Sequence, residues 1–115
     1  MAKVAAAMIL LAMALYTIMA AQVGAVDIVG YTSSTGCSGE VNTRFPAHPD
    51  GACAPFASPK AGSVLFTGLT NCKEGIVYNV DCADIINRKT GPPSSVCFVG
   101  GGFTSAKWRT IPGCV

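Results

Sequence analysis

The fold is decided by a ten-residue pattern that occurs twice, as Ser63-Val64-Leu65-Phe66-Thr67-Gly68-Leu69-Thr70-Asn71-Cys72 and as Ser105-Ala106-Lys107-Trp108-Arg109-Thr110-Ile111-Pro112-Gly113-Cys114. In both copies an aromatic residue follows the serine by three positions and a cysteine follows it by nine. Upstream of each copy stand a tyrosine and two further cysteines, which are Tyr31, Cys37 and Cys53, then Tyr78, Cys82 and Cys97. This period of about 45 residues predicts a duplicated structural unit.

Short β-branched and aromatic segments separated by turn residues predict an all-β protein. We expect strands at residues 27–32, 62–67, 75–80, 96–99 and 103–108, and a single helical turn from Ala83 to Arg88. Two similar half-units, at about 26–73 and 74–115, are each too small to close a core alone. We therefore expect them to pack face to face about a pseudo-twofold axis, as a Greek-key barrel or sandwich within one domain.

The alternation of side chains along a strand assigns a face to each residue of the repeat. Phe66 and Trp108 fall on the apolar face of their strands and are expected to be equivalent core residues. Tyr78 is expected to be at least half buried, with Tyr31 as its counterpart. Lys107 shares the opposite, outward face of its strand with Arg109.

The N-terminus resembles a secretory signal peptide. A lysine precedes a long apolar run, and Val23-Gly24-Ala25 supplies the small residues that signal peptidase requires, so residues 1–25 are expected to be removed before Val26. An uncleaved membrane anchor is the alternative, because the run approaches the length that spans a bilayer. The expected mature chain, residues 26–115, is a single small domain, secreted to the extracellular space.

All six cysteines fall in the expected mature chain: Cys37, Cys53, Cys72, Cys82, Cys97 and Cys114. An even number of cysteines in a short exported chain indicates a disulfide framework rather than a metal site. Fifteen pairings are possible for six cysteines, and their spacing does not choose among them.

The first half carries a set of short motifs in a fixed order. They are Gly36-Cys37-Ser38-Gly39, Thr43-Arg44-Phe45, Ala52-Cys53-Ala54-Pro55-Phe56, the Ser63 to Phe66 segment and a closing Cys72. This set resembles the signature of the macadamia-type plant antimicrobial proteins, and the second half looks like a looser version of it. The close Cys-x-Cys pair of that family is absent here, so its disulfide pattern is not carried over.

The resemblance implies a β/γ-crystallin-like Greek-key fold and a secreted protein that inhibits fungi and other microbes. In a plant it would be a defence protein of the apoplast or cell wall. The implied partner is microbial cell-wall glucan or the microbial membrane surface. We expect a monomer, with a dimer as the alternative.

The candidate residues for target binding are five cations and one aromatic residue: Arg44, Arg88, Lys89, Lys107, Arg109 and Phe56. A basic patch in the second half would attract an anionic microbial surface. A solvated face that protects an edge strand is the other interpretation of the same charges. Phe45, Phe56 and Phe103 lie near loops where they could stack on sugar rings, and a net charge of about +1 on the mature chain gives no support for nucleic-acid binding.

Neither a cofactor nor catalysis is expected. Gly100 and Gly101 stand where a crystallin-type calcium site requires oxygen ligands. The single histidine, His48, has no nucleophile motif beside it. The alternative to a defence protein is a secreted interaction protein, such as a microbial effector or a killer-toxin-like protein on the same scaffold, and a structural role in the extracellular matrix is a third hypothesis.

Overall fold

The computed structural model describes residues 26–58 and 60–114 as an all-β protein with eight strands. The expected signal peptide lies outside these residues. The strands form two antiparallel four-stranded sheets, which confirms the all-β prediction. No helix occurs in the described part of the chain, so none there is long enough to cross a membrane.

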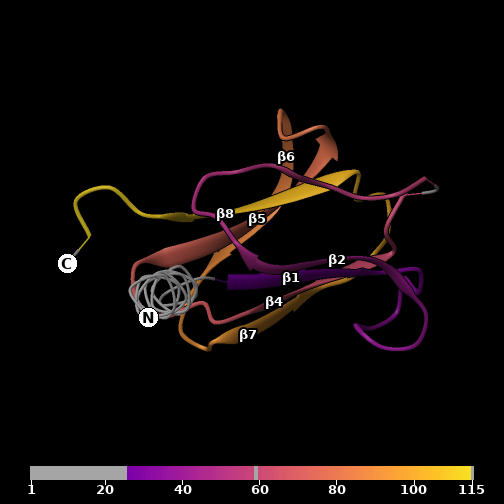
Figure 1. The fold of residues 1–115 in the computed structure, drawn as a ribbon, viewed down its shortest axis with the longest axis horizontal. Helices are drawn as coiled ribbons and strands as arrows, with labels where there is room; N and C mark the ends of the chain where they lie inside the picture. Colours follow the sequence, from indigo (N-terminus) through magenta and orange to yellow (C-terminus); the bar gives the residue numbers. More distant parts are fainter. Residues whose placement is uncertain (1–25, 59, 115) are drawn as a thin grey trace, which may run out of the picture.

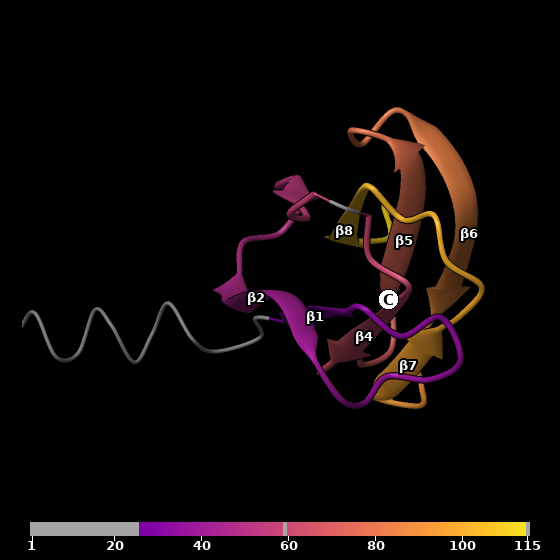
Figure 2. The ribbon, with the colours of Figure 1, turned by 90° about the vertical axis from the view of Figure 1, so that its right-hand side faces the viewer.

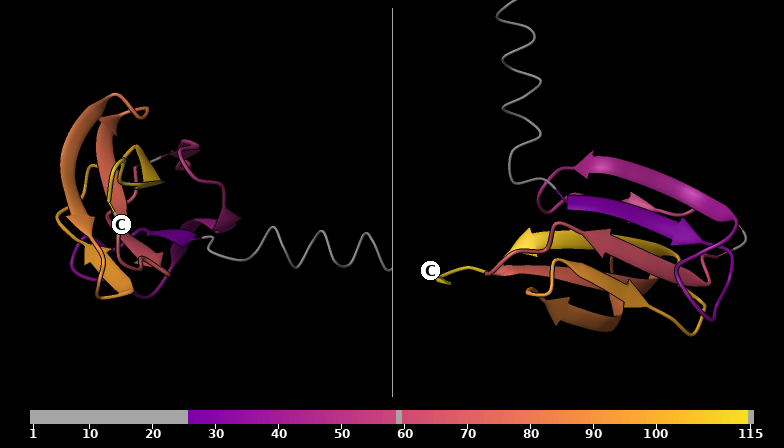
Figure 3. Two further views of the ribbon diagram at one scale, coloured as in Figure 1. Left: turned by 90° about the vertical axis from the view of Figure 1, so that its left-hand side faces the viewer. Right: turned by 90° about the horizontal axis from the view of Figure 1, so that it is seen from below.

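The two sheets form separate layers (Figures 1 and 3). Sheet A has the order β2 (Val41–His48), β1 (Val26–Tyr31), β4 (Ser63–Thr67) and β7 (Ser95–Phe98). Sheet B has the order β3 (Ala54–Pro55), β8 (Ser105–Thr110), β5 (Lys73–Val80) and β6 (Asp84–Thr90). Each sheet thus has one edge strand from the first half of the chain and one from the second.

The two halves exchange their third strands. β7 belongs to the second half of the chain but pairs with β4 in sheet A, and β3 belongs to the first half but pairs with β8 in sheet B. Figure 2 shows β7 beside β4, the strand with which it pairs. Neither sheet can therefore be completed by one half of the chain.

The strand registers of the two sheets match residue by residue. The matching pairs are Tyr31–Ser63 with Tyr78–Ser105, Ile28–Phe66 with Gly75–Trp108, Val29–Arg44 with Ile76–Arg88, and Val64–Phe98 with Ala106–Ala54. Even the register shift beside Tyr31 in the β1–β2 ladder recurs beside Tyr78 in the β5–β6 ladder. The sequence repeat thus corresponds to a repeat of the hydrogen-bonded ladders.

All six cysteines are paired, and every disulfide joins the first half of the chain to the second. The pairs are Cys37–Cys97, Cys53–Cys82 and Cys72–Cys114. In the repeat, Cys37 is equivalent to Cys82 and Cys97 to Cys53, so the first two disulfides are equivalent bonds. The third joins the two equivalent residues Cys72 and Cys114, and the disulfide pattern therefore follows the repeat. The sequence separations of 60, 29 and 42 residues correspond to about 4 kcal/mol of lost chain entropy per bond in the unfolded state.

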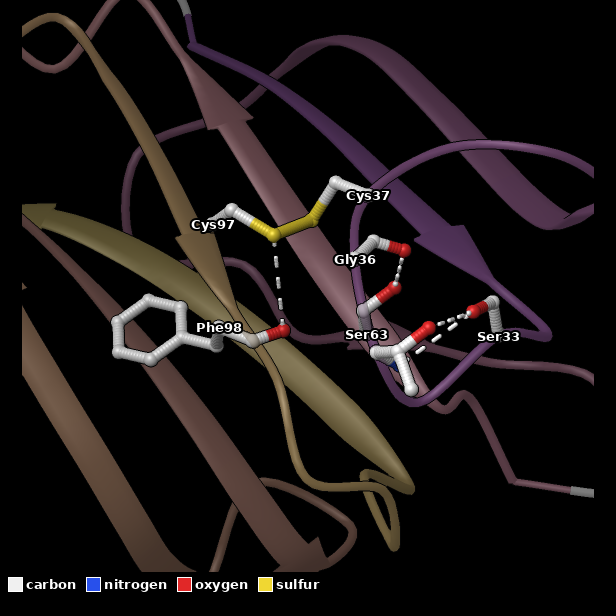
Figure 4. The surroundings of a disulfide bond; sticks show 7 residues. Ser33, Gly36, Cys37, Ser63, Cys97 and Phe98 are labelled. Atoms are coloured by element: carbon white, nitrogen blue, oxygen red, sulfur yellow. Dashed lines mark hydrogen bonds between the residues drawn. A yellow bond between two sulfur atoms is a disulfide. The ribbon is translucent and has the colours of Figure 1, made fainter.

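Two of these disulfides hold the exchanged strands in place. Cys97 lies on β7, and its partner Cys37 lies in the turn that follows β1 (Figure 4). Beside this bond, the hydroxyl of the buried Ser63 donates a hydrogen bond of 2.8 Å to the Gly36 carbonyl. In the other half, the backbone N–H of Cys82 donates to the hydroxyl of Ser105, also at 2.8 Å. In each half, therefore, the repeated serine holds the turn that carries the first cysteine.

The core lies between the sheets and confirms the predicted role of the two aromatic residues. Phe66 is fully buried, and Trp108 is almost so, with its indole N–H donating to the His48 carbonyl at 2.7 Å. Gly75 occupies the position that corresponds to Ile28, and a Cβ atom there would lie 2.9 Å from the Phe66 ring. The absence of a side chain at Gly75 thus leaves room for the Phe66 ring, which comes from sheet A.

Three strands differ from the sequence predictions. The helical turn expected from Ala83 to Arg88 is wrong, because this segment runs into β6 and pairs with β5. β6 is exposed along its whole length, so it lacks the apolar alternation that marks a strand. β2 contains a proline and β3 has only two residues, and neither was expected.

Replacing Gly75 with alanine is expected to lower the free energy of unfolding by about 1–3 kcal/mol, because the added methyl group overlaps the enclosed Phe66 ring. Chemical denaturation of the oxidised protein measures this change. Gly36→Ala is the matched control, since its Cβ atom would meet nothing within 4 Å. Equal stabilities of the two variants would show that Phe66 does not pack on Gly75.

Candidate binding site

A basic hollow lies on the outer face of sheet B. It has a volume of about 370 Å³ and is lined by side chains of β5, β6 and β8 and by the turn between β5 and β6. Its basic residues are Arg88, Lys107 and Arg109, three of the five cations predicted from the sequence. We call this the basic hollow below.

The apolar floor of the hollow holds the cations in position. Ile76 and Tyr78 lie on the face of β5 that points away from the core, yet only 3% of each is exposed. The Lys107 ammonium lies 5.8 Å from the centre of the Tyr78 ring, so the aliphatic part of the lysine runs across the floor. Long cationic side chains cover apolar surface in this way while their charges stay in water. The floor also confirms that Tyr78 is at least half buried.

Arg109 is neutralised by a buried carboxylate. Its guanidinium Nε donates to Oε1 of Glu74, the residue opposite it on β5. The Glu74 side chain is only 7% exposed, whereas that of Arg109 is 43% exposed. Arg109 is therefore required to compensate a buried negative charge, and it adds little net charge to the hollow.

Arg88 and Lys107, the other two cations of the hollow, form no ion pair with any carboxylate of the described residues. Arg88 pairs with Ile76 from β6, and Lys107 pairs with the same residue from β8. Because neighbouring strands are about 4.8 Å apart, the two backbones flank Ile76 at a separation of about 10 Å. Their side chains project from the same face of sheet B on either side of Ile76 and both line the hollow, where one anionic group can contact both.

The remaining predicted cations lie elsewhere. Arg44 is the counterpart of Arg88 but lies on β2, in sheet A. Lys89 pairs with Gly75, whose position faces the core, so it points to the opposite side of β6 from Arg88. The structure therefore brings together three of the five predicted cations, and Arg44 and Lys89 do not contribute to the hollow.

The aromatic residues proposed for sugar stacking pack against the core. Phe103 is 2% exposed, so its prediction as a loop residue available for contact is wrong. Phe56 is half buried, and its ring fills the space beside Gly30, where a Cβ atom would come within 2.7 Å of it. Phe45 packs edge-on against Phe56 at a centroid distance of 6.0 Å. Phe56 also lines a second hollow of about 270 Å³. This hollow has no net charge, because its lining includes one lysine, Lys60, and one aspartate, Asp81.

The same positions on sheet A carry a different chemistry. The register places Leu65 where sheet B has Lys107, Thr67 where it has Arg109, and Asp27 where it has Glu74. Arg44 is thus the only lysine or arginine on the four strands of sheet A, and its neighbours across the sheet are Val29 and then Leu65. The basic hollow therefore occurs on the outer face of sheet B and has no counterpart on the outer face of sheet A, although the described strands of the two sheets have the same register.

His48 has a structural environment. It lies at the end of β2, is largely buried, and its Nε2 is 2.9 Å from the Ala52 carbonyl. Its own carbonyl accepts the Trp108 indole hydrogen bond. Across residues 26–58 and 60–114, no three His, Cys, Asp or Glu side chains are grouped so that they could hold a metal ion.

Replacing Arg109 with serine is expected to lower the free energy of unfolding by about 2 kcal/mol, because the buried Glu74 carboxylate loses its charged partner. Arg88→Ser is the control and is expected to change stability by less than about 0.5 kcal/mol, since its side chain is exposed. Adding Glu74→Gln to Arg109→Ser is expected to recover part of the loss. A double variant no more stable than Arg109→Ser would argue against the ion pair.

Comparison with protein-family models, with curated proteins and with solved structures found no match for this chain. The basic hollow and the disulfide framework are therefore the grounds on which a function is proposed.

Proposed function

We propose that this chain is a secreted defence protein with a β/γ-crystallin-like Greek-key fold. It acts against microbes, chiefly fungi, by binding their cell wall or membrane through the basic hollow. The activity is one of binding, without catalysis or a cofactor.

The strand arrangement supports the crystallin-like part of the proposal. Each half supplies four strands, and its third strand joins the sheet of the other half. Because their strand registers match, the two sheets are related by an approximate twofold axis. In each half the first strand lies between the second and the fourth, which is the neighbour relation of a Greek key.

The disulfides support action outside the cell. Cysteine pairs persist in oxidising compartments, and all six cysteines are paired here. Since Cys37–Cys97 and Cys72–Cys114 together span residues 37–114, a single proteolytic cut in an exposed loop between these residues leaves the two fragments linked. This resistance suits a protein that works in the apoplast or at the surface of a microbe.

The observation that carries the proposal is the restriction of the basic hollow to one of two equivalent faces. Cations that only protect edge strands would lie on those edges, whereas Lys107 and Arg109 lie on β8, which is paired on both sides by β3 and β5, and the equivalent positions of sheet A hold Leu65 and Thr67. Their concentration on sheet B supports a binding role toward an anionic surface.

A second candidate is the secreted effector or killer-toxin-like interaction protein. The outer edge of β6 favours it, because the strand is exposed throughout and its free backbone groups could accept a strand from a protein partner. Such a protein would bind a particular receptor protein and would not inhibit a range of fungi.

The proposal predicts growth inhibition of fungi by the oxidised secreted protein and a loss of potency in the variant R88S/K107S. The minimum inhibitory concentration is expected to rise at least about tenfold, since each cation near an anionic surface contributes about 1 kcal/mol. A broth-dilution assay over several fungi measures this change.

The matched control is Arg44→Ser, which removes the equivalent cation from sheet A. Its inhibitory concentration is expected to stay within about twofold of the unmodified protein, a limit set by the screened, isolated charge. Absence of inhibition in every fungus tested would contradict the antimicrobial proposal, and equal losses in both variants would remove the basic hollow from it.

A further inference from the structure

The β5–β6 hairpin exposes apolar side chains next to the basic hollow. The large apolar residues with high exposure in the described part of the chain are Val80 (55%), Ile85 (48%), Ile86 (46%) and Val99 (54%). Three of these four belong to this hairpin or its strand ends, and Ile85 also lines the hollow. Their clustering beside free cations marks this hairpin as an interaction surface.

The apolar residues of β6 do not serve the core. On β2, the corresponding strand, Phe45 packs against the core cluster and His48 is buried. On β6 all seven residues are exposed, and Lys89 takes the place of Phe45. Figure 1 shows the turn of the β5–β6 hairpin, at the top of the view, standing away from the strands of sheet A. Ile85 and Ile86 therefore remain in water unless a partner covers them.

The chemistry of the hollow complements a phosphate group. Within residues 26–58 and 60–114 no carboxylate pairs with Arg88 or Lys107, whereas Glu74 pairs with Arg109. A guanidinium binds phosphate oxygens through two parallel hydrogen bonds, and an ammonium adds a compact charge. Because the floor residues Ile76 and Tyr78 keep the cations in place, little side-chain entropy is lost on binding.

We propose that the outer face of the β5–β6 hairpin binds the surface of a membrane rich in anionic phospholipid; this deepens the proposed function and rests on it. The lipid phosphate enters the basic hollow between Arg88 and Lys107. Ile85, which lines the hollow, enters the boundary between headgroups and acyl chains together with Ile86, the extra residue at the register shift of the β5–β6 ladder. Cations beside apolar residues are the combination that binds such interfaces. Asp81 and Asp84 flank the turn, so the hairpin docks by its side and not by its tip.

A neutral glucan fits this face less well. Sugar rings stack on exposed aromatic rings, and no aromatic side chain within residues 26–58 and 60–114 is more than partly exposed. Tyr78, which forms part of the floor, is covered. The exposed groups at the hollow are cationic and aliphatic, which is the chemistry of a phospholipid interface.

The test is co-sedimentation of the full chain, secreted and oxidised, with vesicles of phosphatidylcholine with and without phosphatidylglycerol. Binding is expected only to the anionic vesicles. The variant R88S/K107S is expected to bind about 30-fold more weakly, from about fivefold per cation. The variant I85S/I86S is expected to bind roughly tenfold more weakly through lost apolar burial.

Two control variants change residues of the same kind outside the proposed face. Arg44→Ser removes the cation equivalent to Arg88, and Val99→Ser removes an exposed apolar residue outside the hairpin. Both are expected to bind within about twofold of the unmodified chain, because neither lies at the proposed face. Denaturation midpoints confirm that each variant is folded. Equal losses in variants and controls would overturn the assignment of the face.

Parallel arms separate this inference from the proposed function. Binding to insoluble β-glucan without binding to anionic vesicles would overturn the membrane inference and leave the antimicrobial proposal standing. Binding of glucose 6-phosphate without vesicle binding would overturn it in favour of a soluble phosphate ester. Vesicle binding that follows the variant order above, without inhibition of any fungus, would support the membrane inference and contradict the antimicrobial proposal.

Discussion

The whole structure depends on the exchange of one strand between the two halves and on the disulfides that fix it. β3 and β7 each complete the sheet of the other half, and Cys53–Cys82 and Cys37–Cys97 tie them to the turns of the sheets they have joined. A chain with so small a core gains a large part of its stability from such bonds. The core aromatic residues, the serine-anchored turns and the outer face of sheet B all take their positions from this arrangement.

The repeat made much of the fold predictable, because its residues alternate in phase with strands that are buried on one face. Phe66, Trp108 and Tyr78 were placed correctly for this reason. The failures have equally physical causes: β6 is exposed on both faces, and β3 is too short to show a period. The disulfide pairing was out of reach because it depends on the strand exchange, which spacing along the sequence does not reveal.

The candidate site was predictable only in part. Lys107 and Arg109 share a strand face, which alternation alone shows, but the addition of Arg88 required the ladder between β5 and β6. No role was predicted for Glu74 from the sequence. In the antiparallel pair, however, Glu74 lies four residues before Tyr78 and Arg109 lies four residues after Ser105, so a pairing of Tyr78 with Ser105 places Glu74 opposite Arg109. Phe56 was assigned to binding because its position after a cysteine gives no indication that its ring fills the space beside Gly30.

The crossed disulfides also constrain the order in which the chain can mature. Cys37, Cys53 and Cys72 are made first, and none of them pairs with another of the three. As the chain emerges from its N-terminus, the first native bond becomes available only with Cys82, and the last waits for Cys114. Any bond formed earlier is non-native and must be reshuffled. Native pairing of a chain that has formed such a bond therefore requires thiol–disulfide exchange.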